Sequence, residues 1–261
     1  MKLILSIISL LLFSFAGVYS LTAETISGSG CSVSNVGYLS ELTKEYERRT
    51  GIKVFVKGGG SMAGIEDVRT GKVDFAASCR GRMEDDPPGI SFVQVAWDAL
   101  VFIVHKTNPV EDISQDEIRA LYSGRIENWK QMKGDDTMIT IFMSQSHKGL
   151  SGVESSIREL VLQGKEPVMG NNIVSLASTG IVEQMVEKTK EGFASTGFSS
   201  ARMRNVKMLR VNGVEPTKEN IISNKYSFRR PLYILLPGKP KEEVQNFTAY
   251  VLSKEGQQFI S

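Results

Sequence analysis

The sequence has little of what most enzymes and metal sites need. Among 261 residues there are two cysteines, Cys31 and Cys79, and two histidines, His105 and His147. Two histidines leave few ways to build a serine triad, and neither a Gly-x-Ser-x-Gly nor a His-Glu-x-x-His motif is present. Two cysteines can form one disulfide, which is too few for a disulfide scaffold. We therefore expect that the protein is not an enzyme and that it carries no cofactor.

An excess of charge of either sign is also missing. The chain has 31 Lys and Arg against 29 Asp and Glu, a formal net charge of +2. Binding to nucleic acid or to an acidic membrane surface usually requires an excess of positive charge, which this chain does not have. We therefore expect no nucleic-acid partner. The length allows two lobes of about 100–150 residues each.

The one long apolar run lies at the N-terminus. Lys2 precedes the apolar stretch "LILSIISLLLFSFAGV", and small residues suitable for cleavage follow it. Residues 1–20 are thus predicted to be a signal peptide, although cleavage after Ala23 fits nearly as well. A lipoprotein would have a Leu-containing motif directly before its modified cysteine, but Ser29-Gly30 precedes Cys31. We expect a periplasmic protein that is exported with a cleaved signal peptide and is not a lipoprotein.

Segments typical of strands and helices alternate along the rest of the chain, which favours an α/β fold with parallel sheets. Ser114 and Glu117 are spaced as a helix-capping box. Buried strands are expected at 52–56, 72–78 and 99–105, and further strands at 138–143 and 192–198. Helices are expected at 36–49, 114–124, 151–162, 179–192 and 241–260.

No Ser/Gly-rich linker separates these segments, so continuous strands are expected to join two lobes. The chain is predicted to cross between the lobes near Val101–Lys106 and again near Ser195–Arg204. This organisation makes lobe 1 discontinuous, from 21–103 and 205–261, and makes lobe 2 an insertion at 104–204.

Three loops that lead into helices combine glycine with serine. They are "ISGSGCSVSN", "GGGSMAG" and "SQSHKGLSGVESS". Each offers hydroxyl groups and free backbone N–H groups at the positive end of a helix dipole. One such loop taken alone is more often ordinary turn and cap chemistry. If all three meet, they form a cleft that holds a tetrahedral oxyanion mainly with neutral donors.

Several stretches resemble the phosphate-binding proteins that serve ABC importers, which have the type II periplasmic binding-protein fold. The resemblance covers nearly the whole mature chain, and it is carried by "GGGSMAGI", "LYSGRIENW", "SGVESSIRELVL" and "SFRRPLYILLPG". It implies two lobes, each a mainly parallel sheet flanked by helices, with a hinge between them. It also implies a monomer that captures an oxyanion, phosphate first, and delivers it to an ABC permease in the inner membrane.

The resemblance assigns anion contacts to several residues. Ser61 matches the serine of the family's Gly-rich loop, and Ser151 with Gly152 matches the start of the helix in the second lobe. Ser32 matches the hydroxyl of the first loop. Arg80 matches an arginine that would supply positive charge.

Four positions depart from the family's pattern. Leu150 and Val153 replace a glycine and a hydroxyl donor, His147 replaces an arginine, and Cys79 replaces a serine or aspartate. The pocket therefore loses at least two donors, each worth about 1–3 kcal/mol when charge-assisted. Phosphate binding is expected to be weakened, or another anion to be favoured, with His147 as a replacement donor.

Cys31 and Cys79 follow strands that should be neighbours, and three interpretations remain open. They form a structural disulfide, they are free thiols of low pKa at helix starts, or they bind a soft metal or haem iron together with His147. A sensor or interaction module without transport is a further alternative for the whole fold. The acidic run at 84–86 is expected to be a solvated loop.

Overall fold

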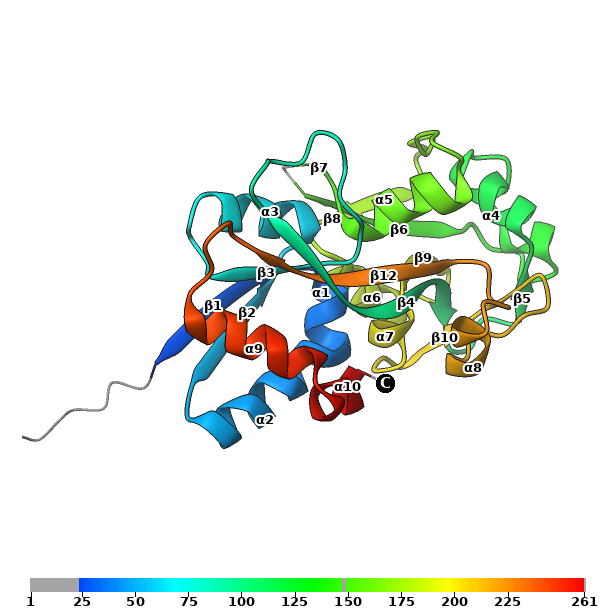
Figure 1. The fold of residues 1–261 in the computed structure, drawn as a ribbon. Helices are drawn as coiled ribbons and strands as arrows, with labels where there is room; N and C mark the ends of the chain where they lie inside the picture. Colours follow the sequence, from blue (N-terminus) through cyan, green and yellow to red (C-terminus); the bar gives the residue numbers. More distant parts are fainter. Residues whose placement is uncertain (1–23, 147–148, 261) are drawn as a thin grey trace, which may run out of the picture.

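A single mixed sheet runs through the molecule, with helices on both sides (Figure 1). The structure is a computed structural model, and it describes residues 24–146 and 149–260; the predicted signal peptide lies outside them. Along the sheet the strands follow the order β2-β1-β3-β12-β4-β9-β6-β7, while β10 pairs with β4 and β8 pairs with β6. Their bounds are β1 Thr25–Gly30, β2 Lys53–Gly58, β3 Phe75–Ser78, β4 Ser91–His105, β6 Thr140–Ser146, β7 Gly149–Leu150, β8 Ile173–Leu176, β9 Gly192–Gly197, β10 Val206–Met208 and β12 Arg229–Leu236.

Parallel pairs lie in both halves of this sheet. β1 is parallel to β2 and β3, and β6 is parallel to β8 and β9. The antiparallel strands β4 and β12 join the two halves. The α/β architecture predicted from the alternation is confirmed, and parallel strands bring their following loops to one edge of each half.

Strand β4 is longer than predicted and passes from one half to the other. Its first part, up to Ala99, pairs with β12, and its second part, from Leu100, pairs with β9. Strand β10 pairs with the last residues of β4, and the chain returns to the first half only through β12. The division into lobes stays a prediction, and these pairings favour a return boundary nearer Arg229 than Asn205.

The helices were mostly anticipated by the sequence. The capping box forms as predicted, because Ser114 Oγ accepts a hydrogen bond from Glu117 N at 3.1 Å and the Glu117 carboxylate accepts one from Ser114 N at 2.7 Å. The helix predicted at 241–260 is broken at Ser253. The helices are α1 Ser32–Ser34, α2 Ser40–Thr50, α3 Ser61–Arg69, α4 Gln115–Tyr122, α5 Gly152–Ser156, α6 Thr179–Lys188, α7 Phe198–Ala201, α8 Lys218–Ile222, α9 Glu242–Leu252 and α10 Lys254–Ile260.

Further short elements connect these pieces. Pi-helical turns join α1 to α2 (η1, Asn35–Leu39) and continue α5 (η3, Ile157–Val161), a 3-10 turn η2 spans Trp129–Met132, and β5 (Asp112–Ile113) pairs with β11 (Arg210–Val211). In Figure 1, α3 and α5 lie above the β4–β12 pair, and α7, α8 and α10 lie below it. The two faces of the β4–β12 pair are therefore covered by different helices.

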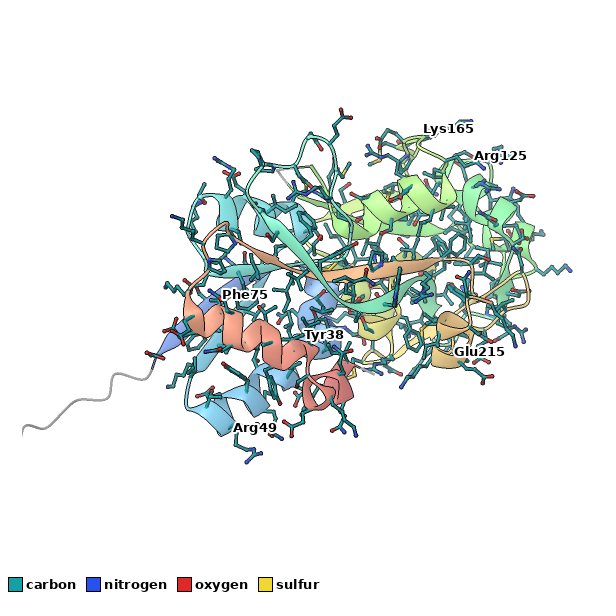
Figure 2. The ribbon with its side chains drawn as sticks, viewed as in Figure 1. Tyr38, Arg49, Phe75, Arg125, Lys165 and Glu215 are labelled. Atoms are coloured by element: carbon teal, nitrogen blue, oxygen red, sulfur yellow. A yellow bond between two sulfur atoms is a disulfide. The ribbon has the colours of Figure 1, made fainter. Side chains whose placement is uncertain are left out.

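A continuous apolar core extends through both halves. Phe75 of β3 and Tyr38 of η1 point inward in Figure 2, whereas Arg49, Arg125 and Lys165 lie at the periphery. Phe75 packs against Phe247 of α9 with their ring centroids 5.2 Å apart. Among the described residues, no helix combines the length and apolar character needed to cross a membrane.

Gly30 ends β1 in a place where no other residue fits. Its φ is +124°, and a Cβ built on it would lie 2.2 Å from the carbonyl oxygen of Ala77. Gly51 also has a positive φ, +76°, but a Cβ there meets no atom within 4 Å. Gly51 therefore reports the cost of a strained backbone alone, whereas Gly30 reports that cost together with a steric clash.

We expect Gly30→Ala to lower the free energy of unfolding by about 3 kcal/mol or more, because it adds a clash with backbone to the strain. Gly51→Ala should lose only about 1–2 kcal/mol, the cost of a left-handed conformation. Urea denaturation of both variants measures the difference. Equal losses would contradict the close approach of β1 to β3.

Candidate functional site

The starts of α1 and α3 lie together at the carboxyl edge of strands β1, β2 and β3. Gly30 pairs with Gly58 on one side and with Ala77 on the other, so the loops after the three strands emerge side by side. Glycine at position 58 lets the first and second loops approach this closely, because a Cβ there would lie only 2.9 Å from Ser32 Oγ. Two of the three predicted Ser/Gly loops therefore meet.

A disulfide links two of these loops. Cys31 and Cys79 are joined, with their Cα atoms 6.0 Å apart, and both side chains are buried. Cys31 also donates its backbone N–H to the carbonyl of Ala77 at 2.8 Å. The disulfide thus fixes the start of α1 against the segment that follows β3.

The third loop reaches this cluster from the other half of the molecule. A Cβ built on Gly152, the first residue of α5, would lie 2.5 Å from Ser61 Oγ and 2.6 Å from Cys79 Sγ. Ser61 is fully buried, and its Oγ accepts a hydrogen bond from Cys79 N at 3.1 Å. Only a glycine can approach Ser61 and the disulfide so closely. We call Cys31, Ser32, Ser61, Cys79, Ser151 and Gly152 the helix-start cluster.

Hydroxyl groups surround the first turn of α5. Ser151 caps the helix, since its Oγ accepts hydrogen bonds from Val153 N at 3.2 Å and from Glu154 N at 3.3 Å. Ser144 at the end of β6 donates its Oγ–H to Ser151 Oγ at 2.6 Å, and it lies 3.0 Å from Thr179 Oγ1 at the start of α6. A further helix start, α6, therefore contributes to the same region.

Glu154 is a buried acid inside this ring of hydroxyls. Its carboxylate accepts hydrogen bonds from Ser144 N at 2.7 Å and Ser144 Oγ at 2.6 Å, and it also contacts Ser151 Oγ. Burial raises the pKa of Glu154, although the bonds from Ser144 and Ser151 work in the opposite direction. The folded chain therefore holds the proton of Glu154 more tightly than water does.

Arg80 follows Cys79 and uses its charge within the protein. Its guanidinium donates to both carboxylate oxygens of Asp86, at 2.7 and 2.6 Å, and both side chains are almost fully buried. Hydrogen bonds from Arg80 and from Met83 N lower the pKa of Asp86, outweighing the opposing effect of burial. The expectation of a solvated loop is thus wrong for Asp86, since this residue holds the arginine beside the cluster.

A second buried ion pair lies where β4 and β12 join the halves. Arg230 Nη2 and Asp98 Oδ2 are 3.0 Å apart, and Asp98 Oδ1 also accepts a hydrogen bond from Ser199 N at 2.9 Å. Arg230 Nη1 lies 3.5 Å from Ser156 Oγ, at the end of α5. This pair ties the connecting strands to α5 and α7 in the second half.

A cleft with a volume of about 690 Å³ opens beside the helix-start cluster, with Cys79 in its wall. Arginines outnumber acids along this cleft. Arg158 forms an ion pair with Glu166 at 2.9 Å, and the Arg229 guanidinium lies 3.8 Å from the ring centroid of Trp97. The charged lining residues are Arg80, Arg82, Arg158, Arg229, Arg230, Glu84 and Glu159. Arg80, Arg158 and Arg230 are each paired with an acid, so Arg82 and Arg229 are balanced by Glu84 and Glu159, and the lining has no excess of positive charge.

The structure brings together most of the residues singled out in the sequence. Ser32, Ser61, Ser151 and Gly152 lie in or beside one buried contact, with the disulfide between them. Arg80 is adjacent to the cluster but is neutralised by its partner. His147 lies outside the described residues.

The sequence analysis did not identify the hydrogen-bonded group around the start of α5, which consists of Ser144, Glu154 and Thr179. The only local signal was Ser151 followed three residues later by Glu154, which is the spacing of a capping box. Ser144 and Thr179 come from distant segments, so only the fold reveals their contact with it.

The metal interpretation does not fit this arrangement. Both Cys31 and Cys79 are used in the disulfide, so neither offers a thiolate to a metal or to haem iron. Within the described residues, no group of three or more His, Cys, Asp or Glu side chains is arranged to hold a metal ion. The disulfide instead acts as a wall of the cluster.

Known proteins match this chain over most of its length. A family model described as "PBP superfamily domain" matches residues 20–255. The phosphate-binding protein PstS of Borreliella burgdorferi is 28% identical over 248 residues, which covers 91% of this chain and 88% of that protein. The phosphate-binding protein PstS of Bacillus subtilis is 26% identical over 239 residues, covering 90% of this chain and 77% of that protein.

A solved structure of a related protein has a similar fold. A putative phosphate ABC transporter substrate-binding protein with bound phosphate, from Clostridium perfringens, superposes with a TM-score of 0.81 at 25% identity. The match covers 90% of this chain and 96% of that one. The two-lobed fold expected from the motifs is thus confirmed.

Replacing Glu154 with Gln tests the protonation of the buried acid. A carboxyl group whose pKa is higher in the folded chain than its ordinary value of 4.5 binds its proton more tightly when folded, so stability falls as pH rises above that value. The glutamine variant does not titrate, and it should lose less stability than the wild type between about pH 5 and pH 8. Urea denaturation across this range measures both profiles; parallel profiles would contradict the assignment.

Proposed function

Because this chain belongs to the PBP superfamily, we propose that it is an extracytoplasmic solute-binding protein that captures phosphate between its two lobes. The observation that carries this proposal is the contact of Gly152 with Ser61 and Cys79, since it joins helix starts from both halves of the molecule. The family of its relatives, which are named as phosphate-binding proteins, supports phosphate as the first candidate among oxyanions.

Helix starts suit a dehydrated oxyanion because their backbone N–H groups have no partner within the helix. Ser61 Oγ is the hydroxyl best placed to join them, since its present partner, Cys79 N, belongs to the same cluster. Ser151 Oγ is largely occupied as the cap of α5, so its contribution is to orient the helix start.

The walls of the cluster are in contact, so the lobes must part for an anion to enter. We infer that the cleft beside Cys79 is the entrance, because it is a large opening whose wall includes a member of the helix-start cluster. The backbone shared by the halves at this point consists of β4 and β12, and rotation about these strands would open the cluster.

Three of the departures from the family pattern reduce the affinity for phosphate. Val153 offers no hydroxyl, Leu150 stands in place of a glycine, and Cys79 is held in the disulfide and cannot accept a proton from the ligand. We expect a weaker site than one with the full set of donors. His147 remains the predicted replacement donor.

The partner we propose is an ABC permease in the inner membrane, which receives the anion from the closed protein. Export through the predicted signal peptide would place the chain in the periplasm as a monomer. No catalytic role is proposed, since the relatives are named as binding proteins.

Isothermal titration calorimetry with phosphate, arsenate, sulfate, molybdate and tungstate tests the proposal. We expect phosphate to bind with one site per chain, and arsenate to bind similarly because it has the same shape and charge. Ser61→Ala should weaken phosphate binding by about tenfold, the cost of one hydroxyl contact to an anion. Heat from none of these anions would refute the proposed function.

Gly152→Ala tests whether closure of the cluster is needed for binding. The added methyl group would overlap Ser61 Oγ and Cys79 Sγ, so the halves could not close, and phosphate affinity should fall by at least about tenfold. Gly180→Ala in α6 is the matched control, because a Cβ there lies 3.9 Å from its nearest atom, on Arg204. Equal affinities of the two variants would show that the Gly152 contact is not part of binding.

A further inference from the structure

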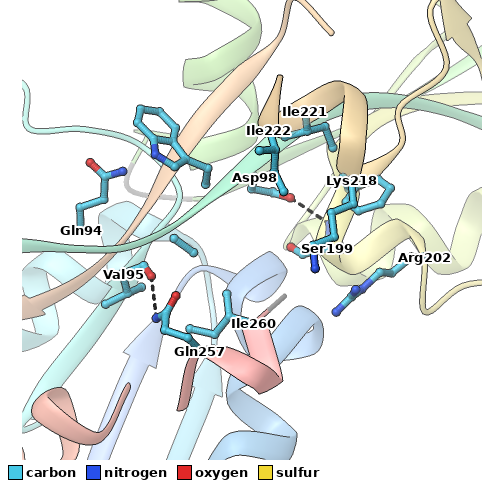
Figure 3. Close-up of a pocket in the computed structure, with 13 residues that line it drawn as sticks. Gln94, Val95, Asp98, Ser199, Arg202, Lys218, Ile221, Ile222, Gln257 and Ile260 are labelled. Carbon is cyan, nitrogen blue, oxygen red and sulfur yellow. Dashed lines mark hydrogen bonds between the residues drawn. The ribbon is translucent and has the colours of Figure 1, made fainter. Parts of the chain in front are cut away.

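A second cavity lies on the other side of the strands that join the halves. It has a volume of about 410 Å³, and its wall includes Gln94–Asp98 of β4 together with residues of α7, α8 and α10 (Figure 3). It shares no lining residue with the arginine-lined cleft, and no member of the helix-start cluster lines it. We call it the rear pocket, and its size is typical of sites for small organic molecules.

Much of the rear pocket is apolar, although it opens to solvent. Trp97 is 50% exposed and Ile222 is 64% exposed, which is unusual for side chains of this size. Phe198, Ile221 and Ile260 continue the apolar lining from three different helices. Ile221 is buried, whereas Trp97 and Ile222 lack a complete covering, which the body of an apolar ligand would supply.

The polar groups of the rear pocket favour a negative charge. Arg202 and Lys218 line it, and within the described part of the chain neither forms an ion pair. The acid of the pocket, Asp98, is already paired with Arg230 and accepts a hydrogen bond from Ser199 N, as drawn in Figure 3. The two cations therefore have no carboxylate to neutralise them.

One hydroxyl group in the wall also lacks a partner. Ser199 is 9% exposed, and its Oγ is buried without a hydrogen bond. A Cβ built on Gly37 of η1 would lie 2.7 Å from this oxygen, so the hydroxyl is covered by η1 and is not accessible from the pocket. In Figure 3, Ser199 lies on the same side of the pocket as Arg202 and Lys218, opposite Gln257 and Ile260.

We propose that the rear pocket binds a small amphipathic monocarboxylate. The carboxylate lies toward Arg202 and Lys218, and the apolar body packs against Ile222 and Ile260. Such a ligand would touch α10 on one side and α7 with α8 on the other, and it would hold these helices at their present separation. An inorganic oxyanion would leave the apolar side chains uncovered, so it does not suit this pocket.

Hexanoate is a suitable probe, and 1-hexanol is its uncharged match. In two-dimensional amide NMR of the ¹⁵N-labelled protein, hexanoate should shift the resonances of Gln94–Asp98, α7 and α10. It should leave those of Ser61 and Gly152 unchanged, which separates this site from the anion cluster whether or not phosphate binds there. 1-Hexanol should bind at least about tenfold more weakly, because it forms no ion pair.

The variant Arg202→Ala/Lys218→Ala should bind hexanoate at least about tenfold more weakly than the wild type. The control Arg125→Ala/Lys225→Ala removes the same charge from exposed positions outside the pocket and should bind as the wild type does. All four side chains are exposed, so both variants are expected to fold. No shift in the pocket resonances, or equal affinity of the two variants, would overturn the proposal.

Discussion

Gly152 lies against Ser61 and the Cys31–Cys79 disulfide, and the rest of the site depends on this contact between halves. It buries polar helix starts in a place without room for side chains. Buried hydroxyl and amide groups must find partners, and here they find them in one another. Ser61 accepts a hydrogen bond from Cys79 N, while Ser151, Ser144 and Glu154 satisfy one another around α5. A bound anion replaces such internal partners with stronger, charge-assisted ones.

Two buried arginines near the contact between the halves are each paired with a buried aspartate. Asp86 neutralises Arg80, and Asp98 neutralises Arg230 on the strands between the halves. Breaking a buried pair is costly because it leaves a charge in a region of low dielectric constant. Hydroxyls and amides form the enclosed part of the site, and the arginines line the open cleft beside it. One of the connecting strands, β4, also forms part of the wall of the rear pocket, which is chemically different.

Local patterns in the sequence predicted the alternating elements, the capping box at Ser114 and the Ser/Gly helix starts, because each depends on residues a few positions apart. They did not predict the full length of β4, since its first half is only partly buried and lacks a continuous apolar run. They also missed Asp86 as a buried partner and the ring of Ser144, Glu154 and Thr179. The contact between Ser144 and Thr179 joins distant segments, and the Asp86 and Glu154 contacts depend on how their loops fold, so hydrophobic patterning did not predict them. The disulfide was one of three interpretations of Cys31 and Cys79, and only the distance between the two residues in the folded chain distinguishes these interpretations.

A crystal structure of the protein grown with phosphate tests the central claim most directly. The account predicts a tetrahedral anion enclosed between the halves, touching Ser61 Oγ and the first amide groups of α5, with the disulfide intact beside it. Phosphate bound only at the arginines of the open cleft, with Ser61 and Gly152 on separate solvent-exposed surfaces, would contradict it.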